Sequence, residues 1–406
     1  MRSVLNPVWI LLILAFANCS VPAQNGPVYY WRNLAGLPGV AGTNDGTGTN
    51  AQFHGPEDVV VDGAGNVYVA DSFNYTIRKI ASDGTVTTLA GIPGVTGTND
   101  GTGTNVLFEY PYALALDGAT NLYVSDLVYG YLRTVTSPGT VTTLGSVGGP
   151  WAILGIAIDS STNIFLANNN LRMIYELTSN RVLETLHITT MGRTPDLNPI
   201  GLAMDNATNL YVSDGLNYAV WKLVLTGTNW ARTLFAGDPS FQGSKDGTGT
   251  NALFADPEGV AVDSATNVYV ADGLTIRKIS SAGAVTTIGG APMQSGTVDG
   301  TNTAARFNGA LWLAVDNAGN VYVADYVNNR ISKGTLLPPL NVVSSGTNVI
   351  VSWPSSFIAW TLQQNSDAGN PAGWIATSYP TNDDGTNKSI TVAPTPGALF
   401  FRLQGN

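Results

Sequence analysis

The sequence predicts an all-β protein that combines a six-bladed β-propeller with a small C-terminal β-sandwich, and three observations support this. One motif recurs six times, with a period typical of propeller blades rather than helical solenoids. The composition, with 46 Gly and abundant Thr and Asn, favours short strands joined by tight turns. No stretch shows a sustained helical period. An Asp stands at the same point of every copy: Asp62, Asp117, Asp159, Asp205, Asp263 and Asp316.

Each copy of the motif divides into four predicted strands. The first is short and almost wholly apolar, as in Val59–Val61, which is typical of a strand buried on both faces. Asp62 and Asn66 bound a hairpin turn, because both residue types accept left-handed backbone geometry. The second strand, 67–70, ends at another Asp, and the third and fourth carry Ile-Arg-Lys-Ile (77–80) and Val-Thr-Thr-Leu. Six such units predict six antiparallel blades.

The two ends of the repeat region complement each other. The sixth unit lacks a Val-Thr-Thr-Leu strand, while a strand of matching type, 31–36, stands near the N-terminus. We expect this strand to complete the last blade, closing the ring and removing two exposed sheet edges. The propeller is therefore expected over residues 28–335, followed by a Pro-rich linker at 336–339.

The repeat can be compared with a known family. With Gly-Val-Ala-Val-Asp at 259–263, Asn-Val-Tyr-Val-Ala-Asp at 267–272 and Ile-Arg-Lys-Ile at 276–279, it resembles the NHL repeat over most of the chain. The resemblance implies the fold but no single function, since similar propellers host lyases, lactonases, RNA-binding modules and adhesion modules. The third copy departs most from the pattern, with Asn169 in place of the second Asp.

The first 23 residues have the features of an export signal. Arg2 supplies a positive charge, residues 8–17 form an apolar run, and residues 21–23 fit a small-residue cleavage site. The apolar run is shorter than the roughly 20 residues that span a bilayer, so no transmembrane segment is expected. Cleavage after residue 23 would remove Cys19; alternatively, Cys19 belongs to a lipoprotein box and is retained with its lipid.

The charge balance argues against nucleic acid as a partner. The chain has 28 acidic and 18 basic residues and a formal net charge of −10. Proteins that bind nucleic acid usually concentrate Lys and Arg on one face, which this sequence does not do.

A mature chain without cysteine and this kind of signal favour a bacterial exported protein, secreted or alternatively periplasmic. We expect it to be a monomer.

After the repeats, residues 340–406 alternate apolar and polar positions in several short runs. This pattern predicts a set of half-buried antiparallel strands and resembles fibronectin type III or immunoglobulin-like modules. A domain of this size without disulfides needs its aromatic side chains inside. We therefore expect Trp353, Trp360 and Trp374 to form its core, the alternative being a sugar-binding platform.

A ligand site is expected on one face of the propeller. The loops between second and third strands emerge there and differ from blade to blade, while the hairpin turns on the other face are uniform. Variation on a fixed scaffold is how binding sites are usually arranged. The candidate ligand-binding residues are Phe73, Tyr75, Tyr129, Tyr218 and Tyr326; the alternative is that these rings pack between adjacent blades.

The long loops that begin at Asp45, Asp100, Asp246 and Asp299 could hold calcium through carboxylate, amide and hydroxyl oxygens. Each loop has one carboxylate, and the spacing matches neither an EF-hand nor a glycine-rich β-helix repeat. We therefore expect no cofactor and a turn in which Asp and Asn bond to their own backbone, with calcium as the alternative.

An enzymatic function lacks several of the residues that it needs. Only His54 and His187 are present, in non-equivalent positions, whereas the zinc sites of amidating lyases with a similar propeller use several His ligands. No nucleophile elbow or phosphate loop stands in a convincing context. A metal-dependent lactonase or lyase would need carboxylates at the channel mouth, and its metal-ligand candidates are Asp58 and Glu258, which begin inner strands.

The sequence therefore favours a binding or scaffold protein over an enzyme. We expect the loop face to engage a polysaccharide or an exported or cell-surface protein, with the sandwich as a spacer or attachment module. The alternative is the metal-dependent lactonase or lyase with its site at the mouth of the channel.

Overall fold

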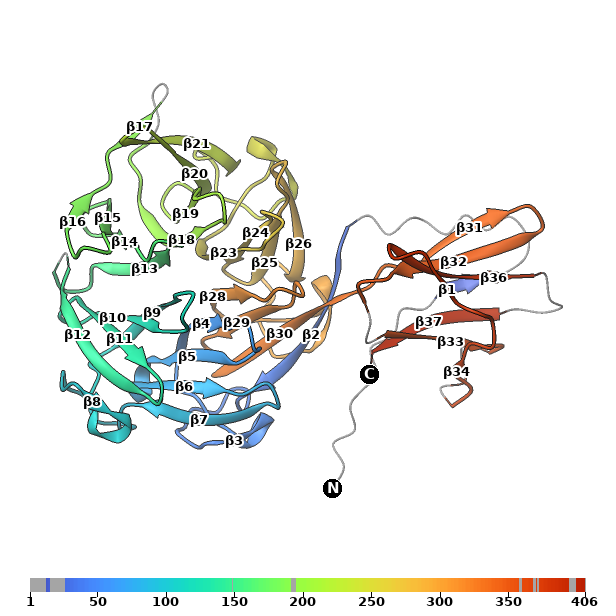
Figure 1. The fold of residues 1–406 in the computed structure, drawn as a ribbon, viewed down its shortest axis with the longest axis horizontal. Helices are drawn as coiled ribbons and strands as arrows, with labels where there is room; N and C mark the ends of the chain where they lie inside the picture. Colours follow the sequence, from blue (N-terminus) through green and yellow to red (C-terminus); the bar gives the residue numbers. More distant parts are fainter. Residues whose placement is uncertain are drawn as a thin grey trace. The chain divides into compact units, whose positions relative to one another are not determined.

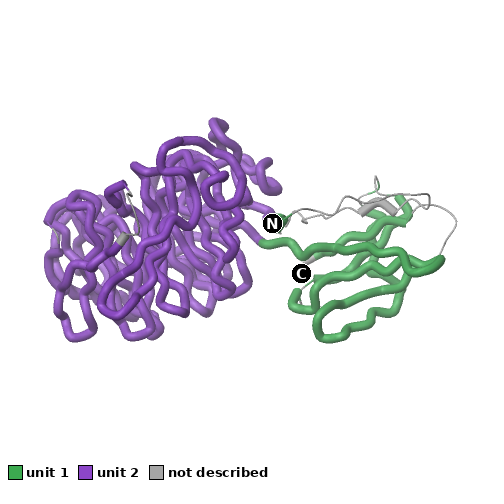
Figure 2. Tube along the Cα trace, turned by 90° about the horizontal axis from the view of Figure 1, so that it is seen from above, with its two compact units in different colours: residues 1–28, 336–406 green, residues 29–335 purple. Residues whose placement is uncertain are grey.

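The computed structural model describes residues 12–14, 26–147, 149–190, 195–357, 360–367, 370, 372–393 and 399–405. The chain divides into two compact units, residues 29–335 and residues 1–28 with 336–406 (Figure 2). Apart from 12–14, the expected export signal with Cys19 lies outside the described residues. Within that described part, no helix is long and apolar enough to span a membrane.

In the described part of residues 29–335, the strands form six separate sheets arranged around a common centre (Figure 1). We number these sheets as blades 1 to 6 in the order of their inner strands. The inner strands are β4 (Pro56–Val61), β9 (Pro111–Leu116), β13 (Ile153–Ile158), β18 (Pro199–Met204), β23 (Pro257–Val262) and β28 (Ala310–Val315). The second strands are β5 (Val67–Asp71), β10 (Leu122–Asp126), β14 (Ile164–Asn168), β19 (Leu210–Asp214), β24 (Val268–Asp272) and β29 (Val321–Asp325).

The outer half of each blade follows the same order. The third strands are β6 (Thr76–Ile80), β11 (Tyr131–Thr136), β15 (Met173–Leu177), β20 (Ala219–Thr226), β25 (Thr275–Ile279) and β30 (Arg330–Leu337). The fourth strands are β7 (Thr85–Ala90), β12 (Thr140–Ser146), β16 (Leu183–Thr185), β21 (Asn229–Gly237), β26 (Ala284–Gly290) and, in blade 6, β2 (Val28–Ala35).

Five of the blades carry a short fifth strand on their outer edge, which the four-strand prediction missed. These are β3 (Gly46–Thr47), β8 (Gly101–Thr102), β17 (Ile188–Thr190), β22 (Gly247–Thr248) and β27 (Gly300–Thr301). Short 3₁₀ turns account for the remaining helical residues: η1 (Gly48–Asn50), η2 (Ser72–Asn74), η3 (Gly103–Asn105), η4 (Gly249–Asn251) and η5 (Asn302–Ala304). Four of the fifth strands are the Gly-Thr pairs of the long loops, which pair antiparallel with the fourth strand of the same blade. In blade 4, β17 instead pairs in parallel with β21.

The ring closes through a strand from the N-terminal side of the unit. Each inner strand contacts the next, and β28 of blade 6 contacts β4 of blade 1. β2 lies between β27 and β30 in blade 6. Its Trp31 is buried, with Nε1 donating a 2.7 Å hydrogen bond to the carbonyl of Ile288 in blade 5. β2 starts earlier than the predicted 31–36 and ends one residue before it, and its first two residues, Val28 and Tyr29, are buried.

Two details differ from the sequence-based expectation, although the boundary between the compact units falls at the expected 335. β30 continues to Leu337, because this residue is buried, so only Pro338, Pro339 and Leu340 separate it from the next strand. In blade 3 the counterpart of the second Asp is Asn168 rather than Asn169, because Asn168 pairs with Ile153 as Asp71 pairs with Pro56.

Each hairpin turn between first and second strands is held by its repeated Asp. In blade 1, Asp62 accepts hydrogen bonds from the backbone N–H groups of Ala64 and Asn66 at 2.9 and 2.8 Å, and from Asn66 Nδ2 at 2.8 Å. The same three bonds recur in the other blades. Asp and Asn favour such turns because their side chains bond to nearby backbone groups.

Buried arginines connect the long loops to the blades. Arg78 donates to the buried Asp71 at 2.8 Å and to Asp45 of the loop at 2.7 Å. The same arrangement is built around Arg133, Arg277 and Arg330. In blade 4 the indole Nε1 of Trp221 replaces the arginine and donates to Asp214 at 2.9 Å. The single carboxylate of each arginine-braced loop is therefore an ion-pair partner.

The other unit is a β-sandwich. One sheet has the order β31 (Asn341–Ser345), β32 (Asn348–Pro354), β36 (Asn387–Val392), β35 (Asn382–Asp383). The second has the order β1 (Leu12–Leu14), β37 (Leu399–Gly405), β33 (Trp360–Asn365), β34 (Ile375–Ala376). Trp353 lies in the core between the sheets and Trp360 packs against that core, whereas Trp374 is half-buried beside Arg402.

Candidate functional site

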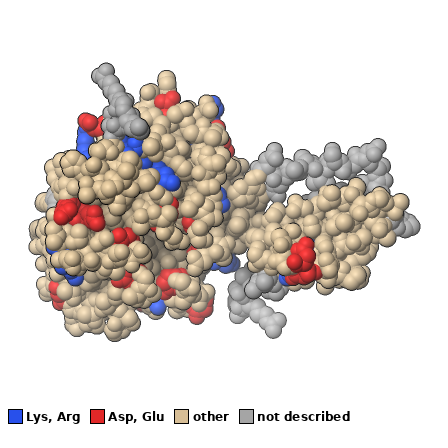
Figure 3. Space-filling model, turned by 45° about the horizontal axis from the view of Figure 1, so that its top comes forward, with Lys and Arg blue, Asp and Glu red and all other residues tan. Residues whose placement is uncertain are grey.

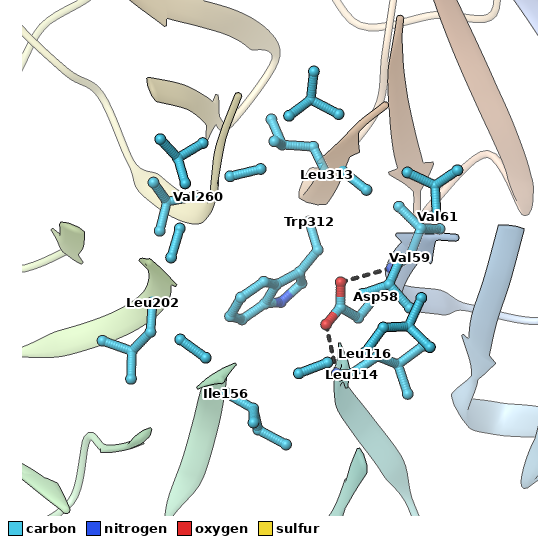
Figure 4. A pocket seen from close by; sticks show the side chains of 18 of the residues that line it. Asp58, Val59, Val61, Leu114, Leu116, Ile156, Leu202, Val260, Trp312 and Leu313 are labelled. Carbon is cyan, nitrogen blue, oxygen red and sulfur yellow. Dashed lines mark hydrogen bonds between the residues drawn. The ribbon is translucent and has the colours of Figure 1, made fainter. Parts of the chain in front are cut away.

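The inner strands surround a channel with an apolar interior. A cavity of about 230 Å³ is lined by all six inner strands, mostly with Val, Leu, Ile and Ala (Figure 4). Asp58 and Trp312 line the end of this cavity nearest the starts of the strands, because every other lining residue comes later along its strand. We call the end of the channel where the inner strands begin the mouth.

Asp58 and Trp312 occupy a position where the other blades have only small residues. The equivalents are Ala113, Gly155, Gly201 and Gly259. A Cβ atom at Gly259 would lie 2.6 Å from Cα of Trp312, so neighbouring inner strands approach too closely for a side chain there. Figure 4 shows the Trp312 indole lying across the channel beside the Asp58 carboxylate. The pair therefore separates the apolar cavity from the mouth.

Both carboxylate oxygens of Asp58 are bonded to the backbone. Its two carboxylate oxygens accept hydrogen bonds from the N–H groups of Val59 at 2.6 Å and Leu114 at 2.7 Å. The second bond ties blade 1 to blade 2. Burial raises the pKa of Asp58 well above its usual value, while these two bonds lower it.

An aromatic cluster lies at the mouth. Tyr110 and Trp151 come just before inner strands, and Phe73 and Tyr326 follow Asp residues that pair with the starts of inner strands. The ring centroids of Phe73 lie 5.6 Å from Tyr110 and 6.0 Å from Tyr326, and those of Tyr110 and Trp151 are 5.7 Å apart. Tyr112 joins Tyr110 to Trp312. We define the cluster as Phe73, Tyr110, Tyr112, Trp151, Trp312 and Tyr326.

Some side chains of the aromatic cluster are exposed to solvent and others are buried. Trp151 is 52% exposed and Phe73 is 38% exposed, whereas Trp312 is buried. His54 lies against the Phe73 ring, with centroids 5.1 Å apart. Gly55 underlies the cluster, because a Cβ atom there would lie 3.0 Å from the Tyr326 ring and closer still to Phe73. The accessible rings therefore form a surface with a buried aromatic floor.

Glu57 places a carboxyl group within this cluster. The Tyr110 hydroxyl donates a 2.9 Å hydrogen bond to Glu57 Oε1, while Glu57 Oε2 is buried with no partner among the described residues. Burial raises the pKa of Glu57 to about 7, although the hydrogen bond from Tyr110 lowers it. A small change of pH near neutrality therefore shifts the Glu57 carboxyl between its protonated and its ionised form.

A second carboxyl group, Glu258, faces the same mouth from blade 5. Burial, followed by the negative charges of Asp256 and Glu57, raises its pKa to about 7. Burial and the charges of Glu57 and Glu258 also raise the pKa of Tyr112. The two glutamates and Tyr112 are therefore electrostatically coupled across the mouth.

The five residues that the sequence nominated for ligand binding lie in different settings. Phe73 and Tyr326 are members of the aromatic cluster. Tyr129 is exposed and contacts Tyr131 of its own blade. Tyr75 and Tyr218 adopt left-handed φ angles of 59° and 49°, and their carbonyls approach the glycines that end the fourth strands. In the described part of the chain, no ring contact joins these three tyrosines to the cluster.

The sequence prediction missed Glu57, Tyr110, Tyr112 and Trp151. All four come directly before an inner strand or at its first residues, where the repeats do not agree with one another. This variation could have pointed to a candidate site, because positions that build the scaffold carry the same residue type in every repeat, whereas positions that bind a ligand need not.

The metal-ligand candidates Asp58 and Glu258 both lie at the mouth. Each oxygen of Asp58 accepts one backbone hydrogen bond, which leaves one further lone pair on each oxygen. Among the described residues, no group of three His, Cys, Asp or Glu side chains is placed to hold a metal ion.

Comparison with known families agrees with this architecture. A family model described as Teneurin NHL domain matches residues 95–297, which is 203 of the 406 residues. The chain belongs to the Teneurin NHL domain family. A short segment of this NHL propeller, residues 49–72, also matches a model described as strictosidine synthase-like, N-terminal.

Individual proteins resemble the NHL propeller at lower identity. The protein SUPPRESSOR OF QUENCHING 1, chloroplastic, of Arabidopsis thaliana is 26% identical over 312 residues, which cover 73% of this chain and 26% of that protein. This chain therefore spans about a quarter of that relative's length.

Two solved structures illustrate the shared fold. An auxiliary nutrient binding protein from Bacteroides thetaiotaomicron matches with a TM-score of 0.61 at 15% identity, covering 79% of each chain. A gluconolactonase from Xanthomonas campestris matches with a TM-score of 0.53 at 14% identity, covering 80% of this chain and all of that one. At these identities the likeness is one of fold alone.

Proposed function

We propose that this chain is an exported binding protein that holds a neutral carbohydrate at the mouth of its propeller. The observation that carries the proposal is the aromatic cluster, with exposed rings at Phe73 and Trp151 beside the buried Glu57. Aromatic faces pack well against the apolar faces of ring-shaped ligands. Glu57 Oε2 has no partner among the described residues and can accept a hydrogen bond from a hydroxyl group.

The charge of the mouth favours a neutral rather than an anionic ligand. Glu57, Asp58 and Glu258 gather there, and the pKa values of the two glutamates are raised to about 7, so they are partly ionised at neutral pH. A uronic acid or sulfated sugar would add another negative charge to this buried set. In the view of Figure 3, charged side chains are scattered over a mostly uncharged surface, which offers no competing basic face on that side.

Export rests on the features of the first 23 residues. We also propose that the protein is bacterial. The sandwich, which resembles fibronectin type III modules, would serve as a spacer or attachment module. One fold neighbour is named a nutrient binding protein, which is consistent with a propeller of this shape serving in ligand capture.

The test is a binding screen of the purified protein on neutral and anionic polysaccharides at pH 7. We expect binding to one or more neutral glycans and none to polyuronates or sulfated glycans. Binding restricted to anionic glycans, or binding to no glycan at all, would rule out the proposed ligand class.

The second candidate is a metal-dependent lactonase with its site at the same mouth, favoured by the fold shared with a gluconolactonase. Against it stands the donor set, because among the described residues no three His, Cys, Asp or Glu side chains gather to hold a metal ion. Elemental analysis of the purified protein, together with a lactone hydrolysis assay, separates the two functions. Near-stoichiometric bound metal together with lactone hydrolysis would establish the lactonase function. It would contradict the proposal that the mouth is a carbohydrate-binding site.

A further inference from the structure

A second cavity, of about 600 Å³, is formed by the loops that surround blade 5. Its lining includes Gln242 and Ser244 from the long loop, Asp272 at the end of β24, Leu274 from the following turn, and Met293 from the loop after β26. None of these residues belongs to the aromatic cluster at the mouth.

The cavity lies where one turn of the repeat is shortened. Four residues separate Asp71 from Thr76 in blade 1, whereas two separate Asp272 from Thr275 in blade 5. The shortened turn lacks the asparagine found at this place in three other blades: Asn74, Asn217 and Asn328. The loss of this side chain opens the space between the turn and the long loop.

In the longer turns the asparagine bridges two acceptors. Asn74 Nδ2 donates to Asp71 Oδ2 at 2.8 Å and to the carbonyl of Gly42 at 2.7 Å. Asn328 makes the same pair of bonds in blade 6, at 2.9 and 2.7 Å. The primary amide therefore joins the Asp that ends the second strand to the long loop of the same blade.

Blade 5 keeps both acceptors without that donor. Gly243 is the counterpart of Gly42, because both donate their N–H to the phenylalanine that closes the loop. Asp272 Oδ2 accepts a 2.9 Å hydrogen bond from Arg277, but no amide donor of the described residues reaches it or the Gly243 carbonyl. In the same wall, Ser244 Oγ is buried with no partner in the described part of the chain.

We propose that this cavity binds a primary carboxamide, whose nitrogen supplies the two N–H donors that the shortened turn lacks. One carboxamide nitrogen can donate to two acceptors, as the asparagine side chains of blades 1 and 6 do. Leu274 and Met293 provide apolar surface for the carbon chain of the ligand. The carboxamide can belong to a small solute or to an Asn or Gln side chain of a peptide. This site is independent of the function proposed for the mouth.

The cavity can be monitored through Met293, whose side chain is exposed at its rim. In protein labelled with ¹³C at the methionine methyl groups, the Met293 signal is assigned with Met293→Leu. We expect propionamide to shift this signal with a Kd on the order of 10 mM, and propionate to leave it unchanged because the Asp272 carboxylate disfavours a second negative charge. A parallel titration with N-acetyl-asparagine N-methylamide separates the sources: tighter binding than propionamide indicates a peptide side chain, and equal or weaker binding a small solute.

Two variants control for cavity occupancy. Replacing Gly273-Leu274 with Ser-Phe-Asn-Tyr, the turn sequence of 72–75, restores the asparagine, and Ser244→Leu narrows the cavity without changing loop length. Both should lose the response to propionamide while keeping the circular dichroism spectrum of the parent protein. An absent shift in the parent protein, an equal shift with propionate, or an unchanged response in both folded variants would overturn the proposal.

Discussion

Glu57 is the second residue of β4, at the mouth, with one carboxylate oxygen bonded to Tyr110 and the other buried without a partner among the described residues. When Glu57 ionises, its buried oxygen therefore gains no hydrogen bond from the described residues to stabilise the charge. The pKa is raised from its ordinary value of 4.5 to about 7, mainly by burial. Between these values the folded state keeps a proton that the unfolded state has released, so stability falls as pH rises through this window.

The first prediction concerns Glu57→Gln, which removes this ionisation and keeps an oxygen for the Tyr110 hydroxyl. We expect the variant to match the parent protein near pH 4 and to exceed its free energy of unfolding by roughly 1–3 kcal/mol at pH 8. Urea unfolding at several pH values measures this. The exposed Glu184→Gln serves as the control, and equal stability of Glu57→Gln and parent at pH 8 would refute the assignment.

The second prediction concerns the buried ion pair of Arg78 and Asp71. Arg78→Met leaves the Asp71 carboxylate buried without its cation, and breaking such a pair typically costs about 3–5 kcal/mol. The loss is measured by urea unfolding against Arg172→Met, which removes an exposed arginine of blade 3. A cost below about 1 kcal/mol, in the range of surface pairs, would show that the arginine does not hold the blade.

At the residue scale the sequence predicted the turn residues of the scaffold but did not nominate several members of the aromatic cluster. The Asp62 turns and Asn66 could be inferred because they recur in every copy. Tyr110 and Trp151 could not, since their contacts join blades 1, 2 and 3 and depend on how the blades are placed around the channel. Tyr75 and Tyr218 have left-handed φ angles within their turns, and their ligand-binding role stays a prediction.

At the scale of elements, β2 is the strand on which the ring depends, because it supplies the fourth strand of blade 6 from the N-terminal side. Its position followed from the sixth unit's missing strand, so the repeat pattern alone was enough to infer it. The four Gly-Thr fifth strands were not inferred, since a pair of two residues carries no alternation from which a strand could be recognised.

The third prediction tests this closure through Trp31, which is buried between blades 5 and 6 against Gly289 and Gly334. Trp31→Ala should lower the free energy of unfolding by about 3–5 kcal/mol, as for large buried aromatics elsewhere. Trp151→Ala, which removes an exposed ring, is the matched control and should leave stability nearly unchanged. Similar stability of the two variants would show that β2 does not close the ring.

At the scale of the whole molecule, the two units have separate hydrophobic cores, and the proposed site lies wholly in residues 29–335. The fourth prediction is that deleting residues 338–406 leaves carbohydrate affinity within about twofold of the full chain, because no residue of the aromatic cluster lies in the sandwich. Calorimetric titration of the truncated chain checks this. A loss of binding from a folded truncated propeller would place part of the site in the sandwich.

The account's central claim is that the aromatic cluster at the mouth binds the ligand, and one titration tests it most directly. A neutral glycan identified in the screen is titrated by calorimetry into the parent protein, the double variant Phe73→Ala with Trp151→Ala, and the control Phe241→Ala, which removes an aromatic ring 63% exposed on another loop. Since each stacked ring is worth on the order of 1 kcal/mol, we expect the double variant to lose affinity at least tenfold and the control to bind as the parent does. Full binding by the folded double variant would contradict the claim.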